Sequence, residues 1–216
     1  KFSFDFEQFF PQGDPDYEFF KNYIKDFESD DNFLLIAVER PEGVFDSTFL
    51  NKFHEFTLKT AELPYVTSSL SLTKMQAPLR TPFGITAVPM IHLDDPAFFP
   101  SDKTRVLQDR RLVHNLISED ATALTVVLKI VNQSSLEQAE ELMAELNKLI
   151  KEYNFAEVHM LGRPYFQREL VWMEKREVIV STFIAALLCA LILYFIFRRW
   201  WTVFISMAGI GMALLF

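Results

Sequence analysis

Residues 123–161 read ALTVVLKIVNQSSLEQAEELMAELNKLIKEYNFAEVHML, and this stretch decides the fold because it predicts a strand, a helix and a strand in succession. Its first nine residues, 123–131, are mostly β-branched or apolar, which favours a strand. The helix begins at Ser134 or Ser135, since each serine has a Glu or Gln three residues later, as in a capping box. A short strand at 156–161 follows. The apolar stripe of the helix consists of Leu136, Ala139, Leu142, Leu146, Leu149 and Tyr153.

A second strand–helix–strand unit lies upstream. Residues 33–38 (FLLIAV) form a continuous apolar run, which predicts a strand covered on both faces. Asp46 can cap a helix that runs to about Leu63 and is stopped by Pro64. Residues 65–73 (YVTSSLSLT) then favour another strand. The residues expected to face inward from this helix are Phe49, Leu50, Phe53, Phe56 and Thr60.

The order of elements from Phe33 onward predicts the fold class. Two strand–helix–strand units separated by a long insertion indicate an α+β fold, a ferredoxin-like split βαβ sandwich. Its sheet is expected to be mostly antiparallel, with both helices on one face. A further helix is expected to start at Asp14-Pro15-Asp16, where an Asp cap precedes a proline in the first turn.

The insertion, residues 74–111, differs in character from the two units. It holds five of the ten prolines and shows no clear periodicity, so an irregular segment with one short helix near 103–111 is expected. Most of the 23 phenylalanines are interpreted as core. Phe98 and Phe99 in this insertion are the candidate residues for contact with a hydrophobic ligand.

The C-terminal part is interpreted as membrane-embedded. Residues 178–197 (VIVSTFIAALLCALILYFIF) carry no charge, and at about 1.5 Å per residue they span the hydrocarbon core of a bilayer. Residues 165–177 look helical and continue into this span without a break. The predicted organisation is a soluble body at 1–177, a transmembrane helix at 178–197, a short cytoplasmic loop at 198–202 and the start of another transmembrane helix at 203–216, truncated at Phe216.

Four residues after the span orient it in the membrane. Arg198 and Arg199 favour the cytoplasmic side, and Trp200 and Trp201 are typical of the headgroup level. The body at 1–177 is therefore expected outside the cytoplasm. Because the chain begins with Lys1 rather than Met and stops within an apolar run, we interpret it as a fragment of a longer polypeptide.

The charges are confined to the body. All 29 acidic residues and all but two of the 21 basic residues lie within 1–177, so the body is acidic. An acidic surface repels phosphate backbones, which excludes nucleic acid as an expected partner. The single cysteine, Cys189, lies inside the apolar span, so the body has no disulfide.

No pattern of catalysis or cofactor binding stands out. The four histidines are far apart in the sequence, and the HExxH, CxxC and GxSxG patterns are absent. His92-Leu93-Asp94-Asp95 is interpreted as a solvated loop rather than a metal site. We therefore expect no enzyme activity, no catalytic residues, no cofactor and no metal.

An ordered set of segments resembles exporters of the resistance-nodulation-division (RND) superfamily, in the branch of hydrophobe and MMPL-type transporters. The likeness covers nearly all 216 residues and corresponds to the first periplasmic porter domain and the membrane helices after it. The segments that carry it are FEQFFPQGDPDYEFFKNYIKDFESDDNFLLIAVE (6–39), GVFD (43–46), SLT (71–73), LISEDATALTVVLKI (116–130) and LGRP (161–164).

This resemblance implies a proton-driven exporter with twelve membrane helices in two repeats, located in the bacterial inner membrane with residues 1–177 in the periplasm. The implied partners are the lipid bilayer, a hydrophobic or amphiphilic (even lipid-like) substrate and the remainder of the transporter chain. A homo-oligomer stays an open option. The alternative is a non-transporting membrane sensor or secretion-accessory protein whose ferredoxin-like domain recognises a partner. The neighbouring sequence separates the two, since a transporter predicts a second copy of this pattern and an ionisable residue in a later membrane helix.

Overall fold

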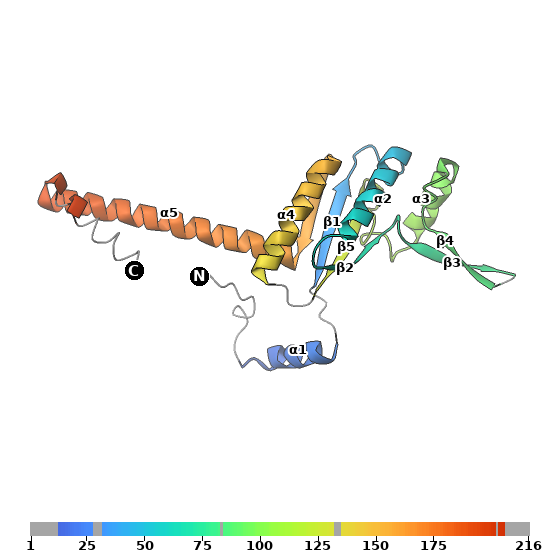
Figure 1. Cartoon of the computed structure of the whole chain (residues 1–216), viewed down its shortest axis with the longest axis horizontal. Helices are drawn as coiled ribbons and strands as arrows, with labels where there is room; N and C mark the ends of the chain where they lie inside the picture. The colour runs from blue at the N-terminus through green and yellow to red at the C-terminus, as the bar shows by residue number, and fades with distance from the viewer. Residues whose placement is uncertain (1–12, 28–31, 83, 132–134, 202, 206–216) are drawn as a thin grey trace. The chain divides into compact units, whose positions relative to one another are not determined.

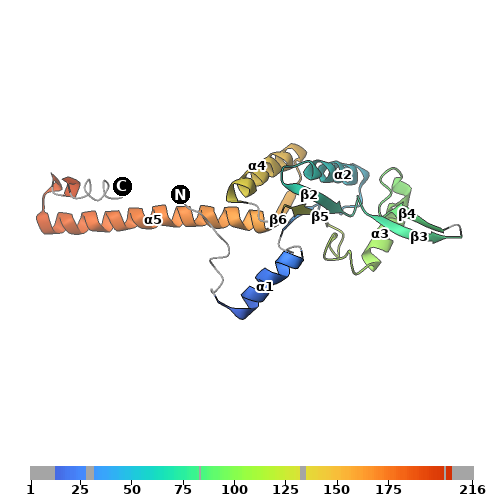
Figure 2. The ribbon, with the colours of Figure 1, turned by 60° about the horizontal axis from the view of Figure 1, so that its bottom comes forward.

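A computed structural model describes residues 13–27, 32–82, 84–131, 135–201 and 203–205. The chain divides into two compact units, one that ends at Arg168 and one that begins at Glu169. The first contains the strands and most of the helices, as Figures 1 and 2 show. The second consists of the apolar C-terminal part.

The elements follow one another in the predicted order, with two strands and a 3₁₀ helix added in the insertion. They are α1 (Pro15–Asp26), β1 (Phe33–Glu39), α2 (Ser47–Ala61), β2 (Val66–Ser71), β3 (Gln76–Thr81), β4 (Gly84–Pro89), the 3₁₀ helix η2 (Pro96–Phe98), α3 (Phe99–Gln108), β5 (Ala123–Ile130), α4 (Leu136–Tyr153), β6 (Glu157–Gly162) and α5 (Arg163–Phe197).

Four strands form one sheet in the order β2-β5-β1-β6, and every neighbouring pair is antiparallel. The units β1-α2-β2 and β5-α4-β6 are therefore interleaved. Strand β5 lies between the two strands of the first unit, and β1 lies between the two strands of the second. The structure confirms a mixed α+β fold with an antiparallel sheet.

The hydrophobic core lies between this sheet and the helices α2 and α4, which are on the same side of it (Figure 2). In β1 and β5 every second side chain is buried, and the alternate ones are half-buried or exposed. Contrary to the prediction from the sequence, residues 33–38 are therefore not fully covered on both faces: one face is buried and the other is half-buried. The apolar run is continuous because apolar side chains such as Leu35 also occupy the half-buried face. The buried strand residues are Leu34, Ile36, Val38, Leu124, Val126, Leu128 and Ile130.

Side chains at the helix ends explain where α2 and α4 begin. The Asp46 side chain accepts a hydrogen bond from the backbone N–H of Phe49 at 2.9 Å, as predicted. At α4 the cap is Ser135, one of the two serines that the sequence offers, and Ser135 and Gln138 form a complete capping box. The inward residues predicted for α2 are all buried.

The insertion is more regular than its prolines suggest, and the prediction of an irregular segment is wrong. Strands β3 and β4 form a hairpin, and the helix begins at Phe99, before the predicted region near 103–111. Each strand of a two-stranded ribbon has one edge without a partner strand. A proline whose nitrogen faces that edge removes no hydrogen bond from the sheet, because no partner strand is there to accept one. The base of the insertion joins the main core through Met90, Ile91 and Val106.

The apolar C-terminal part is helical from the end of the sheet. Helix α5 starts directly after β6 and continues to Phe197, which agrees with the predicted continuity between 165–177 and the span. The helix breaks at Arg198 and Arg199, and helical structure resumes at Trp200. Most of the second helix expected at 203–216 lies outside the described residues.

Candidate functional site

The two phenylalanines that the sequence singles out occupy different environments. Phe98 ends η2 and is 47% exposed, whereas Phe99 starts α3 and is buried in the hydrophobic core. Adjacent residues at this turn point in different directions, so the pair does not act as one surface. Only Phe98 is accessible to a ligand.

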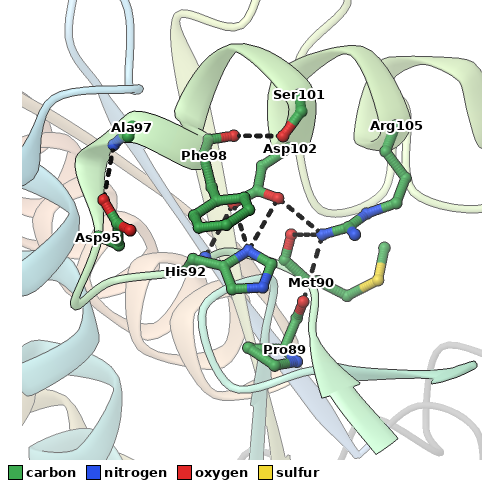
Figure 3. A network of polar contacts seen from close by, with 9 residues as sticks. All are labelled: Pro89, Met90, His92, Asp95, Ala97, Phe98, Ser101, Asp102 and Arg105. Carbon is green, nitrogen blue, oxygen red and sulfur yellow. Dashed lines mark hydrogen bonds and ion pairs between the residues drawn. The ribbon is translucent and has the colours of Figure 1, made fainter.

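A buried carboxylate holds the turn that presents Phe98. The Asp102 side chain, on α3, is only 1% exposed. It accepts a hydrogen bond from the backbone N–H of His92 at 2.8 Å, and the His92 Nδ1 lies 3.0 Å from both carboxylate oxygens. Arg105 donates from Nη2 to the same carboxylate at 2.8 Å (Figure 3). Burying a carboxylate is costly unless donors surround it, and here three do.

Arg105 extends the network to the end of the hairpin. Its Nη2 also donates to the backbone carbonyl oxygens of Met90, at 2.7 Å, and Pro89, at 3.2 Å. These residues end β4 and lead into the loop, as Figure 3 shows. Asp102 and Arg105 therefore fasten α3 to the exit of the hairpin, and the position of Phe98 depends on that attachment.

The Phe98 ring lies over the imidazole of His92, with ring centroids 4.7 Å apart. A carboxylate that orients an imidazole is found in hydrolase triads, but a triad also needs a nucleophile that is hydrogen-bonded to the other imidazole nitrogen. Among the described residues, His92 Nε2 has no hydroxyl or thiol partner, and the nearby Ser101 hydroxyl donates to the backbone carbonyl of Phe98. The geometry is that of a structural network beneath an exposed aromatic ring.

No short-range pattern in the sequence indicates this network. The sequence places His92 beside Asp94 and Asp95, whereas its partner Asp102 is ten residues away on the following helix. The available signal was an Asp three residues before an Arg on a helix, which is common on solvated surfaces. Burial of Asp102, which the sequence does not show, makes the difference.

Asp102→Asn is expected to lower stability. Asparagine has the same shape as aspartate, but an NH₂ group replaces one carboxylate oxygen, so a donor faces the donors of His92 and Arg105. The free energy of unfolding should fall by about 1–3 kcal/mol, the cost of an unsatisfied buried polar group. Thermal unfolding followed by circular dichroism measures this loss.

The matched control is Asp95→Asn. Asp95 caps η2 by accepting from the backbone N–H of Ala97 at 3.0 Å, and Asn caps helices as well as Asp does. Its melting temperature should stay unchanged. Equal melting temperatures for both variants and the wild type would show that the Asp102 network contributes nothing to the fold.

Two carboxylates in loops of the body, Asp109 and Asp120, are stabilised in their charged form by hydrogen bonds. Arg111 donates hydrogen bonds to Asp109 from its side chain and backbone, which lowers the pKa of Asp109 to about 2. Hydrogen bonds from Ser118 and Thr122 likewise lower the pKa of Asp120. The acidic character predicted from composition is therefore maintained at neutral pH in these loops.

The C-terminal helix has the surface of a membrane span. Within the described residues, α5 is the one helix long and apolar enough to cross a bilayer, and its apolar window is not buried in the protein. Large apolar side chains are exposed around the whole circumference, for example Ile179, Phe183, Leu188 and Phe195. A helix that is apolar on every side requires an apolar environment.

The four residues predicted to orient the span lie at its end. Arg198 has a positive φ of 50° and donates its backbone N–H to the Tyr194 carbonyl at 2.8 Å, which ends α5. The Trp200 ring lies 4.7 Å from that of Tyr194, and both tryptophans are exposed. Arg199 lies beside Arg198 in the break. Cations and indole rings thus gather at one end of the apolar helix.

Comparison with known proteins agrees with these features. Among curated proteins no match was found. The model of one family, described as the MMPL family, matches residues 61–216, which include β2, the insertion, the second strand–helix–strand unit and all of α5. This match covers well over half of the chain. The chain therefore belongs to the MMPL family, a branch of the RND superfamily.

Proposed function

We propose that this chain is the periplasmic porter domain and adjoining membrane helices of a proton-driven exporter of the RND type. Membership of the MMPL family is the observation that carries the proposal. The apolar helix α5 supports it, because the function requires a membrane-spanning element. The exported compounds are hydrophobic or amphiphilic, including lipid-like molecules, and the remaining partners are the bilayer and the rest of the transporter chain.

The body at 1–177 is a ferredoxin-like, porter-type domain on the periplasmic side of a bacterial inner membrane. The interleaved strand order β2-β5-β1-β6 supports this assignment of the fold. Arg198 and Arg199 support the orientation, since short cytoplasmic loops are enriched in basic residues. Trp200 and Trp201 sit at the headgroup level at the cytoplasmic end of the span.

The mechanism couples the body to the membrane through α5. Because α5 begins directly after β6, a rearrangement of the sheet edge is passed to the helix without an intervening loop. Alternating access then arises from changes in the body as the membrane helices cycle through protonation states. Residues 178–197 carry no charge, so other membrane helices supply the proton-carrying groups.

A transport assay tests the proposal. The polypeptide that contains this chain is reconstituted in proteoliposomes with an imposed proton gradient and a lipophilic fluorescent dye. Movement of the dye should follow the gradient and stop when a protonophore dissipates it. A protein that moves no lipophilic compound under any gradient would instead support the alternative, a non-transporting sensor or secretion-accessory protein that uses the domain to recognise a partner.

Phe98 is the proposed substrate contact within this chain, with Phe99 supporting it from the core. Phe98→Ala should raise the KM for the lipophilic dye about fivefold, equivalent to about 1 kcal/mol of lost aromatic contact. The maximal rate should change little, because a contact made equally in all states affects binding alone.

Leu58→Ala is the control for Phe98→Ala. Leu58 lies on α2 and is 43% exposed, close to the exposure of Phe98, but it is outside the insertion. Its KM should equal that of the wild type. If both variants raise KM alike, the effect comes from general loss of surface apolarity, and Phe98 is not a substrate contact.

A further inference from the structure

Three side chains that can bind a metal ion meet at one end of the sheet, on the face that carries Leu35 rather than the buried core residues. Glu39 ends β1 and pairs in register with Glu157 on β6. His159 follows two residues after Glu157 and pairs with Ala37. Residues two apart on a strand share a face, so all three side chains leave the sheet on the same side.

Two of the three distances between their ligand atoms match those around a single metal ion. His159 Nε2 lies 3.3 Å from Glu39 Oε1 and 3.3 Å from Glu157 Oε1, and the three ligand atoms are all within 4.8 Å of one another. Metal–ligand bonds of 2.0–2.2 Å place neighbouring ligands of a tetrahedral zinc ion about 3.3–3.6 Å apart. A single N–H cannot donate well to two carboxylates, and 3.3 Å is longer than usual for such a bond.

The negative charge around the three side chains also favours binding of a cation. Glu39 and Glu157 are directly opposite each other on neighbouring strands, an arrangement that is unfavourable for like charges. On the β5 side of β1, a groove of about 480 Å³ is lined by Ala123, which pairs with Glu39, and by the acidic residues Glu119 and Asp120. The carboxylates of Glu119 and Asp120 raise the local concentration of cations, and the solvent exposure of the three proposed ligands leaves a fourth ligand position open to water.

We propose that Glu39, Glu157 and His159 form a binding site for a divalent transition metal of the zinc type. The imidazole nitrogen and the two carboxylate oxygens provide three ligands, and water or a small ligand takes the fourth position. An imidazole ligand favours zinc and related metals over calcium and magnesium, which prefer oxygen ligands alone. This site does not depend on the proposed transport function.

The test is titration of the purified chain in detergent with zinc chloride, followed by isothermal calorimetry. One zinc ion per chain should bind, and His159→Ala and Glu157→Gln should each weaken the binding by more than about tenfold. The three side chains are 41–60% exposed, so the variants should keep the circular dichroism spectrum of the wild type. Cobalt titration of the same chain should give the absorption of a four-coordinate site, and His159→Ala should abolish it.

His114→Ala is the matched control. His114 is also exposed, and its Nε2 is 3.6 Å from Glu119, but it is not part of the three-residue site. Its zinc affinity should equal that of the wild type. The proposal is overturned if His159→Ala binds zinc like the wild type, if His114→Ala weakens binding as much, or if the wild type binds no zinc and the three residues form an ion pair only.

Discussion

Gly162→Ala is expected to destabilise the body strongly. Gly162 ends β6 and pairs with Leu34. Its backbone φ is +152°, a value that residues other than glycine rarely adopt. A Cβ at this position would lie 2.3 Å from the carbonyl oxygen of Phe33 and 2.9 Å from the Cα of Leu34. Both are backbone atoms of the central strand β1, so β6 can accommodate the methyl group only by separating from β1.

The expected loss in the free energy of unfolding is about 4 kcal/mol or more, because backbone strain adds to the clash. This is a large share of the stability of an ordinary domain. Thermal unfolding measures the loss, and hydrogen exchange of the β1 and β6 backbone amides should show that the damage begins at this pair of strands. Because α5 begins at the next residue, the connection to the membrane helix should loosen as well.

Gly84→Ala is the control that separates strain from clash. Gly84 also has a positive φ, of +134°, but a Cβ there would meet nothing within 4 Å. It should lose only the strain, about 1–3 kcal/mol. Equal losses for the two variants would mean that the close approach of β6 to β1 at Gly162 is not present in the protein.

Leu188→Arg is expected to impair membrane insertion of α5. Leu188 lies near the middle of the uncharged run 178–197 and is 53% exposed on the helix surface. An arginine at the centre of a membrane helix costs about 2.5–3.5 kcal/mol in insertion, which would move a large fraction of chains out of the bilayer. Carbonate extraction of membranes followed by quantification of the retained chain measures this fraction.

Met173→Arg provides the comparison. Met173 is on the same helix and 48% exposed, but it stands among charged residues before the uncharged run. It should stay membrane-bound like the wild type. In water, both arginines would be harmless surface substitutions, so equal extraction of the two variants would show that α5 does not cross the bilayer at 178–197.

The local elements could be predicted because their signals are local. Asp46 and the capping box at Ser135 set helix starts through hydrogen bonds that reach only three residues along the chain. The alternating pattern of β5 and the uncharged run in α5 are likewise properties of short segments. The hairpin β3–β4 was missed because its prolines argue against strands, and only its position at the edge of the fold makes them acceptable.

The two side-chain clusters could not be predicted, because their members lie apart in the sequence. Asp102 reaches His92 only because α3 packs back onto the end of the hairpin. Glu39 meets Glu157 and His159 only because β1 and β6 are neighbours in register, and sequence analysis accordingly expected no metal ligands there. The same holds for Phe98 and Phe99, which look equivalent in the sequence and differ in burial.

By itself, the sequence determined the acidic body, the order of strands and helices outside the insertion, the uncharged span and the likeness to MMPL-type proteins, since composition and short-range periodicity carry these properties. Only the tertiary structure decided which aromatic residue is exposed, which carboxylate is buried and which charged residues meet across strands. Burial and contact between distant segments depend on how the whole chain packs, and no short segment contains that information.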